Sequence, residues 1–203
     1  MKSTTLPSVL IVSAPSGAGK TTLINLLSKK HKLKFSVSHT TRQRRDHEIE
    51  GVHYHFITVP EFINLEKAGA FLETACIHGN YYGTAWKNLV HAHEDDSWIV
   101  LDIDIQGFKN IKEKYPQATS VFILPPSIAV LKERILKRQP DIDLFDLEKR
   151  LKIVGDEIKE CIHFDYIVYN EDVDTALDEL CFIVSCEKLR TKRRQNLISL
   201  LGY

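Results

Sequence analysis

Residues 14–21, APSGAGKT, have the composition of a loop that binds phosphate. The loop follows an apolar run, Ser8–Ser13, and opens a helical pattern that begins at Lys20. Glycines let successive backbone N–H groups turn toward phosphate oxygens, and a helix N-terminus adds partial positive charge. Lys20 would reach the β- and γ-phosphates, and the Thr21 hydroxyl would bind Mg²⁺. The usual first glycine is Ala14, so the segment predicts a nucleoside triphosphate site, with a ligand-free glycine-rich turn as the alternative.

A second group of residues is suited to a phosphorylated acceptor. Arg42, Arg44 and Arg45 fall within four positions, directly after a predicted core strand. Guanidinium groups bind phosphate through two parallel hydrogen bonds, so the cluster predicts a second phosphate site. The alternative is a solvated basic surface. The turn 79–84, GNYYGT, could present the phenol groups of further donors, which are Tyr54, Tyr81 and Tyr82.

The elements that must position these residues alternate along the chain. Buried strands are predicted at 8–13, 35–38, 98–103, 120–124 and 166–169, with helical patterns between them. Continuous apolar runs separated by helices predict a parallel sheet covered on both faces, hence a doubly wound α/β fold. Segments 53–58, 71–77 and 81–82 predict a smaller sheet inside an insertion. A helical pattern breaks at 138–146 and resumes after Asp143, which we expect to cap the next helix.

Composition excludes several classes of function. The 203 residues include 27 Lys plus Arg and 27 Asp plus Glu, so bulk positive charge for nucleic-acid binding is absent. No apolar run approaches the ~18 residues of a membrane span, and the run 9–12 is too short for a signal peptide. Four cysteines form no CxxC pair. We expect a cytoplasmic protein with reduced thiols, whose C-terminal helix, 173–194, ends in a solvated basic cluster.

Five segments in order carry a resemblance to a known family: SGAGK (16–20), SVSHTTR (36–42), GNYYG (79–83), LDIDIQG (101–107) and FILPPS (122–127). Together they resemble guanylate kinases of the bacterial type, in the P-loop nucleoside monophosphate kinase family, from about Ser8 to Arg194. The resemblance implies an ATP:GMP phosphotransferase that uses Mg²⁺, yields ADP and GDP, and serves purine nucleotide metabolism. It also implies a P-loop doubly wound parallel sheet with helices on both faces, an inserted mixed β GMP-binding subdomain and a helical lid. The implied ranges are a core of about 1–37, 96–137 and 150–203, an insertion of about 38–95 and a lid of about 138–149.

The resemblance also implies roles for individual residues. The ATP-binding residues would be Ala14, Pro15, Ser16, Gly17, Ala18, Gly19, Lys20, Thr21, Thr22 and Asn170. The GMP-binding residues would be Ser38, Arg42, Arg45, Tyr54, Glu73, Tyr82, Thr84, Asp102 and Asp104. The catalytic residues would be Lys20, Arg134, Arg138 and Arg150, and the metal ligands Thr21 and Asp102, the latter directly or through water. ATP and GMP are the implied partners, with no nucleic acid and no membrane.

The chemistry of guanine agrees with the role implied for Glu73. Guanine offers N1–H and an N2 amine to a carboxylate, whereas adenine offers neither, so adenine would leave a buried acceptor unpaired. In isolation Glu73 could equally be a surface charge. Asp102 and Asp104, two apart on a predicted strand, would point to the same side. Whether Asp102 serves mainly the metal or the base stays open.

Arginines near the helical break are expected to act on the transferring group. Arg134 and Arg138 are four apart and therefore share a helix face, and Arg150 follows the break. In similar kinases such arginines close over ATP and stabilise charge on the phosphoryl group. The alternative is ordinary helix-surface charge.

The chain departs from the family pattern at three places. Residues 43–48, QRRDHE, lack the usual proline and glycine; Thr74 replaces a tryptophan; and residues 137–139, KRQ, replace Gly-Arg-Gly. These changes predict a more flexible loop and altered lid hinging, with the reaction type unchanged. Two other functions stay open: a guanylate-kinase-like module that binds protein partners, and a kinase for another small phosphorylated acceptor. The sequence leaves undecided whether the protein is a monomer or a homo-oligomer.

Overall fold

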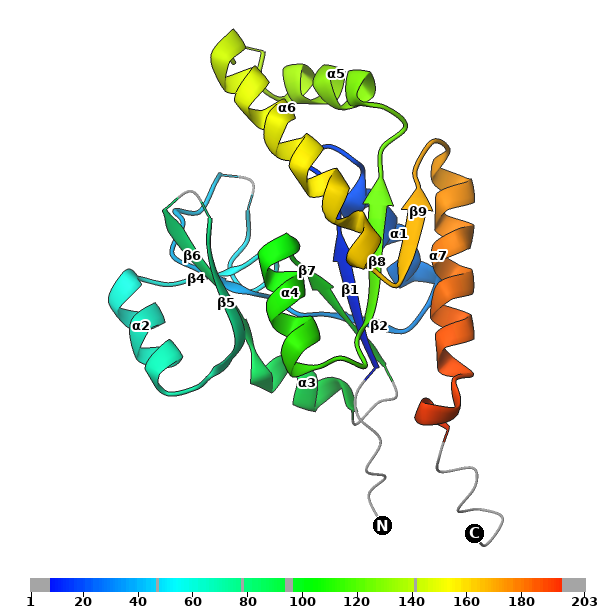
Figure 1. Cartoon of the computed structure of the whole chain (residues 1–203). Helices are drawn as coiled ribbons and strands as arrows, with labels where there is room; N and C mark the ends of the chain where they lie inside the picture. Colours follow the sequence, from blue (N-terminus) through cyan, green and yellow to red (C-terminus); the bar gives the residue numbers. More distant parts are fainter. Residues whose placement is uncertain (1–7, 47, 78, 94–96, 141, 195–203) are drawn as a thin grey trace, which may run out of the picture. The chain divides into compact units, whose positions relative to one another are not determined.

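The computed structural model describes residues 8–46, 48–77, 79–93, 97–140 and 142–194 (Figure 1). Within them the chain forms two compact units, each treated separately below. The P-loop unit comprises residues 12–32 and 119–194, and the mixed-sheet unit comprises residues 8–11 and 33–118. Strand β1 (Ser8–Ser13) contributes residues to both units.

The P-loop unit is built on parallel strands. Strand β8 (Thr119–Leu124) pairs in parallel with β9 (Tyr166–Tyr169). Helix α7 (Val173–Lys188) packs against β9 and against α1 (Lys20–Lys30), as Figure 1 shows. The apolar side of α1, which includes Leu23 and Leu27, is fully buried. The apolar faces of α1 and α7 therefore pack together in the core of this unit, and this packing supports the start of α1.

Two further helices of this unit flank the predicted break. Helix α5 (Ile128–Arg138) begins after Ser127, whose hydroxyl accepts a hydrogen bond from the Val130 N–H. Helix α6 (Leu144–Lys159) begins after Asp143, whose carboxylate accepts from the Asp146 N–H at 2.7 Å. The predicted cap at Asp143 is confirmed. The two helices pack against each other in Figure 1. Short 3₁₀ turns follow at Glu160–His163 and, after α7, at Thr191–Arg193.

The mixed-sheet unit contains a four-stranded sheet of order β4-β3-β6-β5. Its strands are β3 (His39–Thr40), β4 (His55–Phe56), β5 (Phe71–Ile77) and β6 (Asn80–Ala85). The β3–β4 pair is parallel, whereas β6 pairs antiparallel with both β3 and β5. The register shifts between Phe71 and Glu73, which places a bulge at Leu72.

Helices cover this sheet and lead back to parallel strands. Helix α2 (Val59–Lys67) begins with a capping box and buries Phe62 against Phe71. Helix α3 (Trp86–His93) follows β6, and α4 (Ile105–Lys114) follows β7 (Trp98–Asp102). Strand β7 pairs in parallel with β2 (Leu33–Phe35).

The parallel sheet as a whole has the order β2-β7-β1-β8-β9. Both the parallel α/β sheet and the separate mixed sheet agree with the predicted fold class. Among the described residues, no helix is both long enough and apolar enough to cross a membrane.

Several predicted boundaries are wrong. The strand predicted at 35–38 is observed at Leu33–Phe35. The Ser36 N–H still donates to the Val100 carbonyl of β7 at 3.0 Å, but the Val37 carbonyl accepts from the side chain of Asn88 at 3.2 Å. The final helix ends at Lys188 instead of Arg194. Asp104 is not on a strand, because β7 ends at Asp102. Residue propensities and hydrophobic periodicity do not show where the hydrogen bonds of a strand or helix stop, so they do not fix the exact ends of these elements.

We predict that Gly83→Ala destabilises the protein by ~1–3 kcal/mol through overpacking. A Cβ on Gly83 would lie 2.9 Å from the ring of Phe71, which is itself stacked on Phe62. The matched control is Gly155→Ala in α6, where a Cβ meets nothing within 4 Å and helix propensity favours alanine. Urea unfolding followed by circular dichroism measures both variants. Equal stability of Gly83→Ala and wild type would contradict the packing argument.

Candidate functional site

The glycine-rich loop lies between the end of β1 and the start of α1, as predicted. Gly17 and Gly19 have φ values of 89° and 96°, a region that side-chain-bearing residues rarely adopt. The Ala18 N–H donates to the Pro15 carbonyl at 3.1 Å, which closes a tight turn. The loop therefore has the backbone curvature that phosphate binding requires, at the N-terminus of an 11-residue helix.

Two side chains from distant parts of the P-loop unit hold this loop. Arg134 Nη1 donates to the Gly17 carbonyl at 2.8 Å, and Asn170 Nδ2 donates to the Ala18 carbonyl at 2.7 Å. A Cβ on Gly19 would lie 2.4 Å from Asn170 Nδ2, so Gly19 is required for close approach as well as for its φ. Asn170 is 3% exposed. Its predicted contact with the base of ATP stays a prediction, and the structure shows it bound to the loop.

The other residues predicted for ATP lie on the same unit. Thr21 and Thr22 are exposed on the first turn of α1, and Lys20 is half-buried. Arg150 is exposed on α6. Arg138 is the last residue of α5, and its side chain lies outside the described part of the structure.

In the mixed-sheet unit, a buried carboxylate lies on β5. Glu73 is only 4% exposed, and its Oε1 accepts a hydrogen bond from Thr84 Oγ1 at 2.7 Å. Ser38 Oγ lies 3.5 Å from the same hydroxyl. Glu73 Oε2 is buried and has no hydrogen-bond partner among the described residues. Burial raises the pKa of Glu73, because removal from water disfavours the charged form.

An arginine and a buried glutamate form an ion pair in the loop after β3. Arg42 Nη2 lies 2.6 Å from Glu48 Oε1, and the Arg45 N–H donates to Glu48 Oε2 at 2.8 Å. The guanidinium of Arg42 holds the pKa of Glu48 down at about 2. Arg44 Nη1 donates to the Glu48 carbonyl at 3.2 Å. Glu48 thus organises the loop whose proline and glycine are missing, a role that the sequence reading did not assign.

Tyrosines complete the surroundings of Arg42. Its Cζ lies 5.5 Å from the ring centre of Tyr54, and the rings of Tyr54 and Tyr82 are 5.9 Å apart. Burial and the nearby charge of Asp102 raise the pKa of Tyr54. The structure therefore brings together three residues predicted from separate segments to bind the acceptor phosphate. The side chain of Arg45, in contrast, is exposed.

The two aspartates after β7 have different surroundings. Asp102 ends the strand and is exposed. Asp104 caps α4, with its Oδ1 accepting from the Gly107 N–H at 2.8 Å. The expectation that both carboxylates point from one side of a strand is therefore wrong. Asp104 still acts on Glu73, since its charge raises the pKa of that carboxyl.

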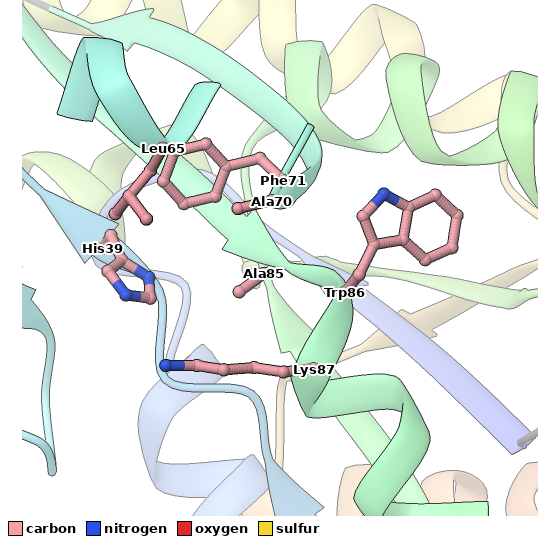
Figure 2. A pocket seen from close by; sticks show the side chains of 7 residues that line it. All are labelled: His39, Leu65, Ala70, Phe71, Ala85, Trp86 and Lys87. Atoms are coloured by element: carbon pink, nitrogen blue, oxygen red, sulfur yellow. The ribbon is translucent and has the colours of Figure 1, made fainter. Parts of the chain in front are cut away.

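A pocket of about 220 Å³ lies in the same unit but does not include the predicted acceptor-binding residues. Figure 2 shows its lining, which is His39, Leu65, Ala70, Phe71, Ala85, Trp86 and Lys87. His39 and Ala85 follow Ser38 and Thr84 directly, and successive strand residues point to opposite faces. The mixed sheet therefore has Ser38, Thr84 and Glu73 on one face and this largely apolar pocket on the other.

The glycine loop at the start of α1, on a parallel α/β sheet, is typical of the class of P-loop proteins that bind nucleoside triphosphates. Comparisons with known proteins name the family. A family model described as guanylate kinase matches residues 7–187, and the chain belongs to the guanylate kinase family.

Individual relatives agree with this assignment. The guanylate kinase of Carboxydothermus hydrogenoformans is 40% identical over 195 residues, which are 96% of this chain and 95% of the relative. That of Coxiella burnetii is 42% identical over 194 residues, covering 95% and 94%. The crystal structure of guanylate kinase from Anaplasma phagocytophilum matches with a TM-score of 0.77 at 31% identity, covering 95% of this chain and 92% of that one.

We predict that Glu48→Gln lowers stability at pH 7 and that this loss shrinks in acid. The pKa of Glu48 is about 2 in the folded protein against an ordinary 4.5, so its contribution is complete above about pH 5 and disappears as the pH falls toward 2. Urea unfolding of both proteins at pH 7, 4 and 2.5 measures the difference. A difference that stays constant over this range would contradict the linkage.

Proposed function

We propose that this chain catalyses phosphoryl transfer from ATP to GMP, giving ADP and GDP, in the cytoplasm. The observation that carries the choice of acceptor is Glu73, a buried carboxylate with one oxygen bonded to Thr84 and the other without a partner among the described residues. Guanine would supply the missing donors through N1–H and its N2 amine. Adenine has no donor at N1 and no N2 amine, so it would leave the carboxylate unpaired at high cost.

The acceptor phosphate would bind at the cluster of Arg42, Tyr54 and Tyr82. Arg42 is oriented by its ion pair with Glu48 through Nη2 and by a hydrogen bond from Nη1 to the Gln43 carbonyl at 2.8 Å. The three remaining guanidinium N–H groups, on Nε, Nη1 and Nη2, would be the ones to reach a phosphate. Two phenol hydroxyls add neutral donors. The guanidinium of Arg42 would therefore already be oriented before a dianionic phosphate binds, which reduces the entropy lost on association.

ATP would bind in the P-loop unit. The backbone N–H groups of the loop and the helix N-terminus would hold the phosphates, with Lys20 at the β- and γ-phosphates. Arg134 is bonded to the Gly17 carbonyl and thus lies at the loop. Arg138 and Arg150 are proposed to stabilise charge on the transferring group when the lid closes and excludes water. In this mechanism the transfer is direct, without a covalent intermediate on the protein.

We propose that Mg²⁺ accompanies ATP. The hydroxyl of Thr21 and the carboxylate of Asp102 are exposed hard oxygen donors, the kind that Mg²⁺ prefers. Such a donor set fits a metal that is held mainly by the nucleotide's phosphates, with few protein ligands. When bound, the ion would neutralise charge on the phosphates.

We expect ADP release from MgATP to be fast with GMP and near background with AMP, UMP, CMP or no acceptor. Glu73→Gln should reduce the preference for GMP over AMP by about 100-fold or more, because the buried site loses its double acceptor. A coupled assay with each acceptor measures both proteins. Turnover without acceptor preference would refute the base-recognition role. No turnover with any acceptor, from folded protein that binds ATP, would favour a binding module.

We expect Lys20→Met to lower turnover by orders of magnitude without loss of cooperative unfolding, because the side chain acts on phosphate charge. Arg42→Met is best made together with Glu48→Gln, since removing the arginine alone leaves a buried carboxylate unpaired. The double variant should have a much higher KM for GMP than Glu48→Gln alone, at unchanged KM for ATP. Wild-type-like kinetics in either variant would refute the role of that residue.

A further inference from the structure

One face of α4 runs along β5, on either side of Glu73. Gly107, Asn110 and Lys114 are spaced by three and four residues and therefore share that face. A Cβ on Gly107 would lie 3.3 Å from Glu73 Oε2, so the helix backbone approaches the unpartnered carboxylate oxygen closely. The helix start is secured here by Asp104, which caps the Gly107 N–H.

Strand β5 needs support at this point because of its place in the sheet. It is an edge strand, and the bulge at Leu72 leaves that residue without a partner on β6. Carbonyls of residues two apart point to the same edge of a strand, so Leu72 and Thr74 present theirs away from β6. An edge strand with a bulge would otherwise bend and twist freely.

Helix α4 supplies hydrogen bonds to both carbonyls. Lys114 Nζ donates to the Leu72 carbonyl at 2.7 Å, and Asn110 Nδ2 donates to the Thr74 carbonyl at 3.1 Å. The first bond holds the peptide group immediately before Glu73, and the second holds the peptide group between Thr74 and Ala75 on the other side. Together they restrain β5 on both sides of Glu73, so that a bend of the strand there, which would move the Glu73 side chain relative to Thr84, is opposed.

We propose that Asn110 and Lys114 are positioning residues for guanine recognition, because they hold the backbone on both sides of Glu73 and so aim its free carboxylate oxygen. This inference rests on the proposed role of Glu73 as the guanine acceptor. Neither residue touches the base: they act through β5. Their effect falls on the discrimination between guanine and bases that lack the N2 amine.

The charges around Glu73 support the same arrangement. Burial and the neighbouring Asp104 raise the pKa of the carboxyl, whereas Thr84 on β6 and the ammonium of Lys114 lower it. Lys114 therefore also favours the ionised form, which accepts two hydrogen bonds from guanine.

The test compares Asn110→Ala and Lys114→Met with Lys112→Met. Lys112 is a matched control, because it lies on the same helix and its Nζ also donates to a backbone carbonyl at 2.7 Å, that of Ala118. For each variant kcat and KM are measured with GMP and with IMP, which keeps N1–H but lacks the N2 amine. KM for ATP and the urea midpoint are measured in parallel.

We expect Asn110→Ala and Lys114→Met each to lower the GMP-to-IMP ratio of kcat/KM by about tenfold, mainly through KM for GMP. KM for ATP should not change. Lys112→Met should retain the wild-type ratio even if its stability falls, and Lys114→Arg, which keeps a charged donor, should restore most of the loss. The two variants test separate bonds, so failure of one to fold leaves the other decisive.

A wild-type ratio in both variants, whatever their stability, would overturn the inference and leave the bonds as structural supports only. Glu73→Gln in the same assay separates this failure from that of the proposed function. If Glu73→Gln loses the GMP preference while both α4 variants keep it, only the positioning role is wrong. If Glu73→Gln itself keeps the preference, the proposed role of Glu73 is wrong.

Discussion

Glu73 is an almost fully buried carboxylate, one oxygen of which has no hydrogen-bond partner among the described residues, and such a group is unfavourable in an isolated folded protein. Glu73 stays in this state because a hydroxyl from β6 bonds one oxygen and α4 holds the strand on both sides. The unpaired oxygen Oε2 lies where the absence of a side chain at Gly107 leaves room. In the proposed function, the energetic cost of burial would make the site selective, because only a ligand with matching donors would relieve it.

The same principle recurs at both segments that are proposed to bind phosphate. In the P-loop unit, Arg134 and Asn170 take carbonyls of the loop as acceptors, and this keeps the loop in a conformation that glycines alone only permit. In the loop after β3, the Glu48 carboxylate forms an ion pair with the side chain of Arg42 and accepts a hydrogen bond from the backbone N–H of Arg45. In each case a polar side chain fixes the direction of groups that would otherwise be mobile, which is how binding sites reduce the entropy lost on association.

Much of the fold could be predicted, because its signals are local. Apolar runs marked β1, β8 and β9, and the capping aspartate at Asp143 marked the start of α6. The glycine loop was recognisable because its φ values demand glycine. The prediction for Asp104 was wrong: its position two residues after Asp102 suggested that both lie on one strand, whereas Asp104 is the N-cap of α4. A short period-two pattern cannot distinguish a strand end from a helix cap.

The sequence by itself determined the class of fold and the glycine-rich loop, since these depend on residue type and short spacing, and its resemblance to guanylate kinases supplied the residues that are predicted to bind guanine and phosphate. Only the tertiary structure decided which oxygen of Glu73 accepts a hydrogen bond from Thr84 and that Glu48 orients Arg42. It also decided that Asn110 and Lys114 donate hydrogen bonds to β5 on both sides of Glu73. These are contacts between residues up to 42 positions apart, and residue type alone does not show which carbonyl a side chain will reach. The contacts of Asn110 and Lys114 depend on the bulge at Leu72 and the packing of α4 against β5, which exist only once the chain has folded.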